Sequence, residues 1–378
     1  MAESGFLGAR LKRLTFGDLD GFAKDHLQET WAAFLLSCEA ILSETPHQRL
    51  AVAYSEAQND VAKKALQIGM NLTSRDIGSF FEENFTPFLI VPDESKDEHH
   101  PAFFTAYYRP EVVASRFATS EFSEPLFARP IDLVTLQPGE DMPGLSGLAA
   151  ARRREDGTLV PYLTRAEIDS GNLGALAAPL AYVADAIEAF MIHVQGSARL
   201  RFPDGSCADL TYAGRNGRPY TSIGKILIAD GALSLEDMSL ARLKAWVRAN
   251  GQKPGEKGRA LLHRNESFVF FSSSPVKDPK IEPLAAANVR LTTHRSIAID
   301  RSLWPYGLPF WIEADLPWHD GQMNRFRRMM IAQDTGSAIL GPARADLYFG
   351  TGDEAGLLAG NIRHSGRMIV LLPHGHAL

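Results

Sequence analysis

The chain has 378 residues, 45% of them hydrophobic and 22% charged, which is ordinary for a globular protein with room for two domains. Its formal net charge of −6 provides no positive field, so nucleic acid is not an expected partner. The sequence holds no apolar run long enough to cross a bilayer. The two cysteines, Cys38 and Cys207, favour inert packing positions, and the sequence leaves a disulfide between them open.

The N-terminal part of the chain is predicted to contain three helices. Apolar residues recur at helical spacing over residues 27–42, and Asp18 and Asp20 are candidate caps before them. A second helix is expected over about residues 50–68. A third begins at Thr73, where the pattern Thr-x-x-Asp has the form of a capping box.

From residue 103 onward the sequence changes to short strands and turns. Residues that favour β-structure predict a strand over 103–108 and a hairpin over 200–212. Ser234 opens a second capping-box pattern, which predicts a helix toward Asn250. Short apolar runs with no long helix between them then indicate a closed barrel. These runs cover residues 268–271, 296–299, 310–312, 329–332, 347–349 and 368–372.

Three aspartates stand at the edges of these C-terminal apolar runs. Asp300, Asp334 and Asp346 each begin or end a predicted strand, and glycines between the last two leave backbone room for a ligand. Any one of them alone is better explained as a turn or strand cap. Three in one small barrel favour a shared acidic cleft, and carboxylates in a cleft are the usual acids and bases of sugar chemistry.

Two further segments are rich in neutral hydrogen-bonding side chains. Gln195 precedes Gly-Ser, and Tyr220 lies in Gly-Arg-Asn-Gly-Arg-Pro-Tyr-Thr-Ser-Ile-Gly at residues 214–224. Such groups suit hydroxyls and amides, although for any single member a plain turn is an equal explanation. In the strand over 103–108, the core is favoured for Tyr107, and core and sugar stacking are evenly balanced for Tyr108.

Other chemistries have no support in the sequence. The segment at residues 350–353 lacks the lysine of a phosphate-binding loop, and no Gly-x-Ser-x-Gly elbow is present. The histidines show no metal-ligand spacing. We therefore expect neither a cofactor nor a metal.

Taken together, these motifs resemble the membrane-bound lytic murein transglycosylase A family. The likeness runs in order from about residue 103 to the end of the chain. Its C-terminal part is similar to the three-aspartate domain, through Asp300, Asp334 and Asp346. The other matching segments are residues 104–110, 161–168, 194–197, 214–224 and 265–271.

The resemblance implies a mainly β fold with N-terminal helices. Residues 1–110 and 265–378 would form a double-psi β-barrel, and residues 111–264 an inserted, barrel-like β domain, with a substrate groove between the two. It also implies cleavage of the β-1,4 bond between N-acetylmuramic acid and N-acetylglucosamine in peptidoglycan, leaving a 1,6-anhydromuramoyl end.

The resemblance also implies roles for individual residues. Asp346 matches the catalytic residue, acting first as acid and then as base, and Asp334 matches a supporting aspartate. The remaining positions would contact the glycan; they are Thr105, Tyr108, Gln195, Tyr220 and Asp300.

The implied partner is a peptidoglycan glycan strand, bound by a monomer, with outer-membrane or cell-wall proteins as further candidates. The implied location is the periplasm or outer membrane, yet residues 1–5 show neither a signal peptide nor a lipobox cysteine. Two alternatives stay open: an inverting endoglycanase that uses Asp346 and Asp334, and a non-catalytic, expansin-like glycan binder.

Overall fold

The chain forms two compact units. In the computed structural model, which describes residues 4–6, 8–43, 45, 47–95, 97, 99–136, 144–276, 278 and 280–376, the first unit is Met1–Tyr108 with Ile281–Leu378 and the second is Arg109–Lys280. The second boundary lies later than the residue 265 that we predicted. The reason is that β13 (Val269–Pro275) pairs along its whole length with β12 (Cys207–Arg215) of the insert.

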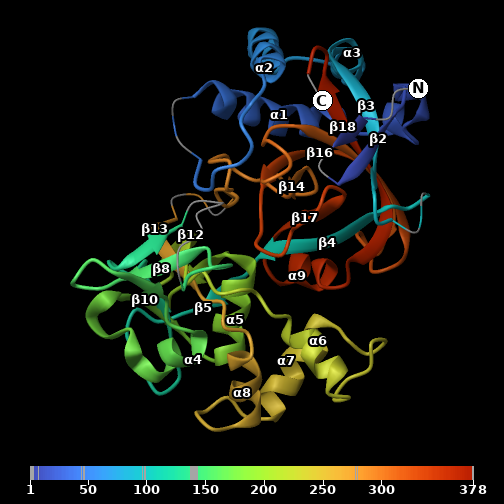
Figure 1. Ribbon diagram of the computed structural model, residues 1–378. Helices are drawn as coiled ribbons and strands as arrows, with labels where there is room; N and C mark the ends of the chain where they lie inside the picture. Colours follow the sequence, from blue (N-terminus) through green and yellow to red (C-terminus); the bar gives the residue numbers. More distant parts are fainter. Residues whose placement is uncertain are drawn as a thin grey trace. The chain divides into compact units, whose positions relative to one another are not determined.

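Strands of the first unit close into a ring, which confirms the predicted barrel (Figure 1). The order around the ring is β18-β15-β16-β14-β17-β4, and the pairing of β4 with β18 completes it. Closure leaves the ring without exposed strand edges. The ring strands are β4 (Ala102–Arg109), β14 (Ser296–Ala298), β15 (Pro309–Leu316), β16 (Asn324–Asp334), β17 (Arg344–Thr351) and β18 (Arg363–Pro373).

The long strand β18 serves two neighbours on the same edge. Its first half pairs with β4 and its second half, from Ile369, pairs with β3 (Phe85–Pro92). From β3 the sheet continues through β2 (Ala9–Arg13) to β1 (Ser4–Phe6). One helix of this unit, α9 (Asp353–Ala359), connects β17 to β18.

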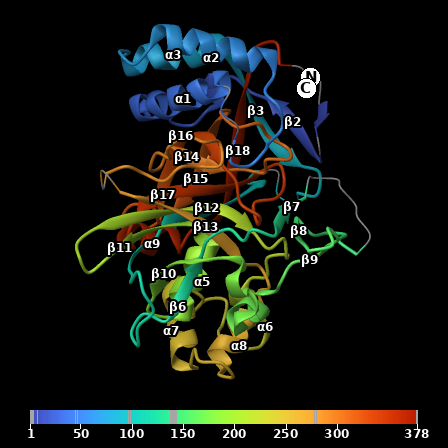
Figure 2. The same cartoon turned by 90° about the vertical axis from the view of Figure 1, so that its left-hand side faces the viewer.

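The three N-terminal helices form a layer over the barrel, as Figure 2 shows, with α1 between the strands and the other two helices. They are α1 (Leu27–Leu42), α2 (Glu56–Ile68) and α3 (Ser74–Asn84). Their apolar faces share one core with the barrel, in which Trp31 and Phe34 meet Trp311, Met329 and Ile369. Burial of these large side chains is what holds the layer in place.

The caps of these helices agree only in part with the sequence. Thr73 and Asp76 form the expected capping box of α3. Helix α2 begins later than predicted, because Ser55 caps it. Asp18 and Asp20 do not cap α1: Asp18 bonds to a nearby threonine, and Asp20 pairs with arginines of β16.

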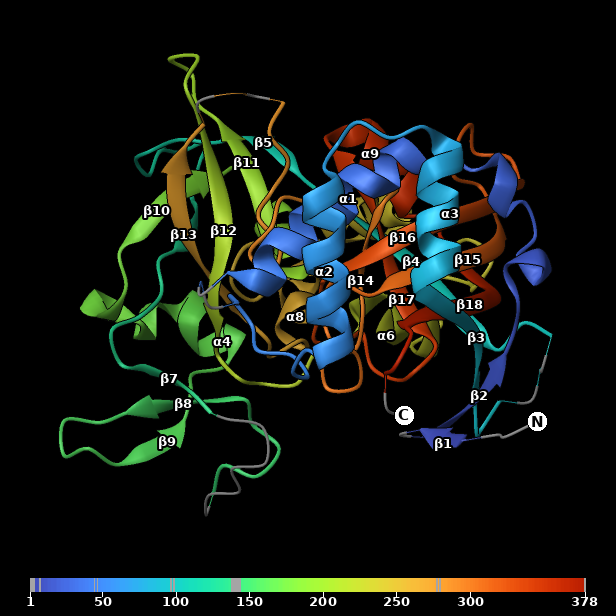
Figure 3. The same ribbon diagram turned by 90° about the horizontal axis from the view of Figure 1, so that it is seen from above.

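The second unit contains three small sheets and five α-helices among its described residues. Figure 3 shows its largest sheet, in the order β13-β12-β11-β5, and the predicted hairpin is confirmed as β11 with β12. The other sheets are β10-β6 and β7-β8-β9. The elements not yet placed are β5 (Glu111–Val113), β6 (Glu124–Phe127), β7 (Leu133–Thr135), β8 (Ala150–Arg153), β9 (Leu159–Pro161), β10 (Pro179–Val183), β11 (Ser197–Arg201), α4 (Arg165–Glu167), α5 (Ala186–Gln195), α6 (Ile223–Ala229), α7 (Leu240–Ala249) and α8 (Lys257–His263).

The helix predicted to start at Ser234 begins later. Ser239 caps α7, while Ser234 and Asp237 bond to each other in a turn. Both cysteines are free thiols, and burial raises the pKa of the Cys38 thiol, which makes it unreactive. Within the described part of the chain, the helices are all too short or too polar to span a membrane.

A buried ion pair joins the N-terminal segment to the barrel. The Arg295 side chain is fully buried and donates to both carboxylate oxygens of Asp25, each at 2.8 Å. Asp25 also accepts the backbone N–H of Met329 in β16 at 2.9 Å. The same guanidinium donates to the backbone carbonyl of Met329 at 3.2 Å and to Glu29 of α1 at 3.0 Å. This pair therefore ties α1, β14 and β16 together.

We expect Asp25→Asn to lower the free energy of unfolding by about 3 kcal/mol, because the change leaves a buried guanidinium without its main counter-charge. Urea denaturation measures the loss. Asp60→Asn is the matched control, since Asp60 pairs with Lys63 at 3.2 Å on the exposed surface of α2. That change should cost less than about 1 kcal/mol. Equal losses in the two variants would contradict the role of the buried pair.

Candidate active site

The candidate site is built where β4 lies beside β17 in the ring. Side chains alternate between the two faces of a strand, so every second residue of β4 and of β17 points to the same side. Three contacts join these two rows. They are Arg344 over the Phe103 ring at 5.3 Å, Thr105 hydrogen-bonded to Asp346, and the Tyr107 and Tyr348 rings with centres 5.1 Å apart.

Asp346 is half-buried in the middle of this arrangement. The Thr105 hydroxyl donates to its Oδ1, and Arg344 Nη2 donates to the Thr105 hydroxyl oxygen at 2.6 Å. Burial raises the pKa of the Asp346 carboxyl above its usual range, the Arg344 charge and the Thr105 hydrogen bond oppose the rise, and the Asp334 charge adds to it. The net result is a carboxyl group suited to hold a proton.

Asp334, at the end of β16, is the second carboxylate of the site. Its Oδ2 accepts the Tyr107 hydroxyl at 2.9 Å, and its Oδ1 accepts the backbone N–H groups of Thr335 at 2.9 Å and Ala286 at 3.1 Å. Burial raises the pKa of Asp334, while the charge of Arg49 and these donors lower it. Both oxygens are held, so this carboxylate has a fixed orientation.

The two carboxylates are brought together by the short strand β14. Ala298 is the register partner of Asp334 on one side and of Asp346 on the other. The gathering of these two aspartates follows from strand order, which their spacing in the sequence does not show. Asp334 and Asp346 thus flank the same point of the barrel wall.

Asp300, the third aspartate, is turned toward the backbone. Its Oδ1 accepts the N–H and hydroxyl of Ser302, and its Oδ2 accepts the N–H of Gly341 at 2.7 Å. Gly341 has a φ of 106°, in the region that favours glycine. Asp300 therefore anchors the loop that runs from Asp334 to Asp346.

The two tyrosines of β4 have opposite environments. Tyr107, for which we favoured the core, places its hydroxyl on Asp334. Tyr108 is buried, and a Cβ added at Gly356 of α9 would lie 2.6 Å from its ring. Thr105 and Tyr107 point to the same face because they are two residues apart, and this spacing is a signal that the sequence contains.

Arg344 was also missed at the sequence level. It lies two residues before Asp346 and so shares its face of β17. An arginine in a strand is usually assigned to a solvated surface, and its partner Thr105 is 239 positions away in the chain. The alternation of side chains along β17 could have singled out Arg344, but only if the pairing of β17 with β4 had been known.

Gln195 and Tyr220 belong to the second unit. Gln195 ends α5, and Gly196 follows it in the left-handed conformation. Tyr220 lies in the loop before α6 and is 37% exposed. Two asparagines fix the backbone of that loop. Buried Asn216 donates to two backbone carbonyls at 2.9 and 2.8 Å, and Asn265 accepts the N–H of Thr221 at 3.2 Å. The exposed ring is thus presented on a fixed backbone.

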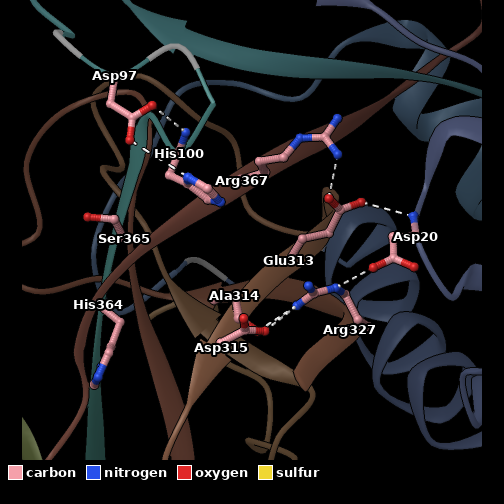
Figure 4. A pocket seen from close by; sticks show the side chains of 10 residues that line it. All are labelled: Asp20, Asp97, His100, Glu313, Ala314, Asp315, Arg327, His364, Ser365 and Arg367. Atoms are coloured by element: carbon pink, nitrogen blue, oxygen red, sulfur yellow. Dashed lines mark hydrogen bonds and ion pairs between the residues drawn. The ribbon is translucent and has the colours of Figure 1, made fainter. Parts of the chain in front are cut away.

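A polar cavity of about 510 Å³ lies on the barrel unit (Figure 4). Arg367 pairs with Glu313 at 2.6 Å, and Arg327 lies between Asp20 and Asp315, so both arginines are neutralised within the cavity. The lining residues are Asp20, Asp97, His100, Glu313, Ala314, Asp315, Arg327, His364, Ser365 and Arg367. Neither carboxylate of the candidate site lines it.

Two family models match the chain. The MltA specific insert domain covers residues 103–272, and the 3D domain covers residues 295–372. The match to the MltA specific insert domain overlaps the second unit. The match to the 3D domain covers most of the C-terminal part of the barrel. The class defined by this combination is that of MltA-type proteins.

Two sequence relatives carry the same name. The membrane-bound lytic murein transglycosylase A of Vibrio cholerae is 39% identical over 208 residues, which are 54% of this chain and 54% of that protein. The aligned part thus spans about half the length of that relative. The protein of the same name from Escherichia coli is 35% identical over 284 residues, which are 74% of this chain and 67% of that protein.

Solved structures agree over nearly the whole chain. The membrane-bound lytic murein transglycosylase from Agrobacterium tumefaciens has a TM-score of 0.83 and 31% identity, covering 96% of this chain and 97% of that one. Escherichia coli MltA with bound chitohexaose has a TM-score of 0.67 and 26% identity, covering 98% and 96%. The chain belongs to the membrane-bound lytic murein transglycosylase A family, as its motifs indicated.

We expect Tyr107→Phe to raise the pKa of Asp334 further, because the variant removes a hydrogen bond that favours the charged carboxylate. Carboxyl ¹³C NMR titration of aspartate-labelled protein measures the change. Tyr162→Phe is the matched control, since Tyr162 donates to Asp132 at 2.7 Å in the second unit. If Asp334 titrates at the same or a lower pH in Tyr107→Phe, the Tyr107 hydrogen bond does not lower the pKa of Asp334.

Proposed function

We propose that this protein is a lytic transglycosylase that cleaves the β-1,4 bond between N-acetylmuramic acid and N-acetylglucosamine and leaves 1,6-anhydromuramoyl ends. The observation that carries the proposal is the state of Asp346. It is a half-buried carboxyl whose raised pKa favours the protonated form, and its Oδ2 accepts no hydrogen bond from the described residues. Such a group can donate a proton to a bound sugar.

Asp346 would act as acid and then as base. In the first step the proton of Asp346 passes to the glycosidic oxygen. The bond between that oxygen and C1 of the N-acetylmuramic acid breaks, and the electron pair of the bond stays on the oxygen. In the second step the C6 hydroxyl of the same sugar attacks C1, and its proton returns to Asp346. The nucleophile is already part of the substrate, so its effective concentration is high and no water takes part.

The geometry of Asp334 supports this mechanism over an inverting hydrolysis. An inverting enzyme needs a second carboxylate free to take a proton from water. Both oxygens of Asp334 instead accept hydrogen bonds, one from Tyr107 and the other from two backbone N–H groups. We therefore assign it a supporting role, in which its negative charge helps to keep the proton on Asp346. A raised acid pKa is also of no use to a non-catalytic binder.

We assign glycan contacts to both units. Tyr220, with its exposed ring, would stack on a sugar face, and Gln195 would bond to sugar hydroxyls or acetamido groups. In the first unit, Thr105 would act on the glycan through Asp346. Tyr108 is buried against α9, so we assign it to holding β4, and Asp300 to holding the loop before β17. The chitohexaose bound by the Escherichia coli relative supports an extended glycan as the ligand.

We infer the setting of this activity from the names of the relatives. The relatives are named as membrane-bound murein enzymes, so we place this protein at its substrate, in the periplasm or at the outer membrane. We propose that it acts as a monomer, with outer-membrane or cell-wall proteins as candidate partners.

We expect Asp346→Asn to fold normally and to lose at least about a hundredfold in the rate of anhydro-product formation, because an amide cannot donate the acid's proton. Mass spectrometry of products from purified peptidoglycan measures this, since an anhydro end is lighter than a hydrolysed end by one water. Asp320→Asn, in an exposed loop of the same unit, is the control and should keep its activity. Near-normal turnover by Asp346→Asn, or hydrolysed ends from the unmodified protein, would sink the proposal.

The same assay has a defined pH dependence. An acid with a raised pKa keeps its proton to a higher pH than an ordinary aspartate, so activity is present below that pKa. It should then fall as the pH rises through the pKa of Asp346. A rate that instead increases across this range would point to a base as the first catalyst.

A further inference from the structure

Thr105 has a single hydroxyl hydrogen, and its neighbours decide where that hydrogen points. The Nη2 group of Arg344 lies 2.6 Å from the Thr105 oxygen and can only donate. The oxygen therefore accepts from Arg344, and its own hydrogen is directed to Oδ1 of Asp346. Among the described residues no other acceptor takes that hydrogen.

This direction has a consequence for the two oxygens of Asp346. Oδ1 accepts the hydrogen bond from Thr105, and a proton placed on Oδ1 would make that oxygen a much weaker acceptor for it. Weakening a hydrogen bond in a part-buried site is costly. The proton of the acid form is therefore better placed on Oδ2, the oxygen that the described residues leave open.

Arg344 is itself held firmly enough to set this direction. Its guanidinium lies over the ring of Phe103, 5.3 Å from the centre, and donates to the backbone carbonyl of Ala345 at 2.5 Å. Cation–π contact and a planar array of donors fix the orientation of the group. An ammonium on a flexible stem would not give the same geometry.

We propose that Arg344, acting through Thr105, assigns the catalytic proton to Oδ2 of Asp346 and so decides which oxygen works on the glycosidic bond. The inference rests on the function proposed above. Arg344 does not touch the reacting atoms, so it is a positioning residue. Proton balance is unchanged: Oδ2 gives its proton to the leaving oxygen and later takes one from the C6 hydroxyl.

Arg344 also acts on the carboxylate left after the first step. The charged groups that face Asp346 are Arg344 on its own strand and Asp334 at the end of β16, while Thr105 and Tyr107 face it from β4 as neutral groups. The Arg344 charge stabilises the carboxylate, and the Asp334 charge opposes it. Their opposing effects keep the carboxyl group able both to give and to take a proton.

The test uses five forms of the full chain. Arg344→Met removes the charge and the donors, Thr105→Val removes the hydroxyl, and Thr105→Ser restores it. Arg363→Met is the matched control, because Arg363 is exposed on β18 as the register partner of Thr105 and is not among the groups that shift the pKa of Asp346. The fifth is the unmodified protein. Each is measured by carboxyl ¹³C NMR titration of Asp346, and by the rate of anhydro-product formation against pH.

We expect Arg344→Met to raise the pKa of Asp346 further, because an opposite charge close by is lost. The pH at which activity declines should move upward by the same amount. In both Arg344→Met and Thr105→Val the kcat should fall by about a hundredfold, because the acid is no longer oriented. Thr105→Ser and Arg363→Met should match the unmodified protein in both measurements.

Two results would overturn the inference. One is an Arg344→Met protein in which Asp346 titrates and acts as before, and the other is a loss in Thr105→Ser equal to that in Thr105→Val. Failure of the proposed function gives a different result. In that case the unmodified protein would make no anhydro ends, while the NMR titration would still show whether Arg344 and Thr105 control the Asp346 carboxyl.

Discussion

The surroundings of the two carboxylates depend on the place of β4 between β17 and β18. Until β4 takes its place, the barrel is an open sheet and Asp346 has no hydroxyl beside it. Once β4 is in place, its alternating residues give Asp346 a donor and Asp334 another. The same hydrogen bonds that close the ring thus bring together groups from three strands. Structure and chemistry here are consequences of a single strand register.

The fold could be predicted from the sequence wherever its signals are local. The capping box at Thr73 and the apolar spacing over α1 need only neighbouring residues. The same box at Ser234 failed, because the residues after it form a turn and Leu235 is 68% exposed, with no core to pack against. Asp20 was misassigned because its arginines lie more than 300 positions away. No local pattern reports such a partner.

The residues of the candidate site also fall into two groups, those marked by local sequence signals and those whose roles depend on distant partners. Asp334, Asp346 and Thr105 could be singled out because aspartates at strand ends and a matching motif mark them in the sequence. Arg344 could not, since its contact with Thr105 exists only when β4 lies against β17. The spacing of Tyr107 from Thr105 puts both on one face, but its contact with Asp334 in β16 is not local in the sequence. The glycan contact of Asp300 stays a prediction, while its carboxylate accepts hydrogen bonds from Ser302 and Gly341. The role of a carboxylate depends on the groups that its oxygens bind, and the sequence shows only that the aspartate is present.

The position of β4 in the chain also affects when the protein becomes active. Thr105 and Asp346 are 241 positions apart, and the whole second unit is made between them. Contacts this distant form late, because the intervening chain must first be synthesised and ordered. During translation β4 therefore waits without its barrel neighbours, and no N-terminal fragment contains an assembled acid. A protein proposed to cut the cell wall is in this way harmless until its last strands have been made.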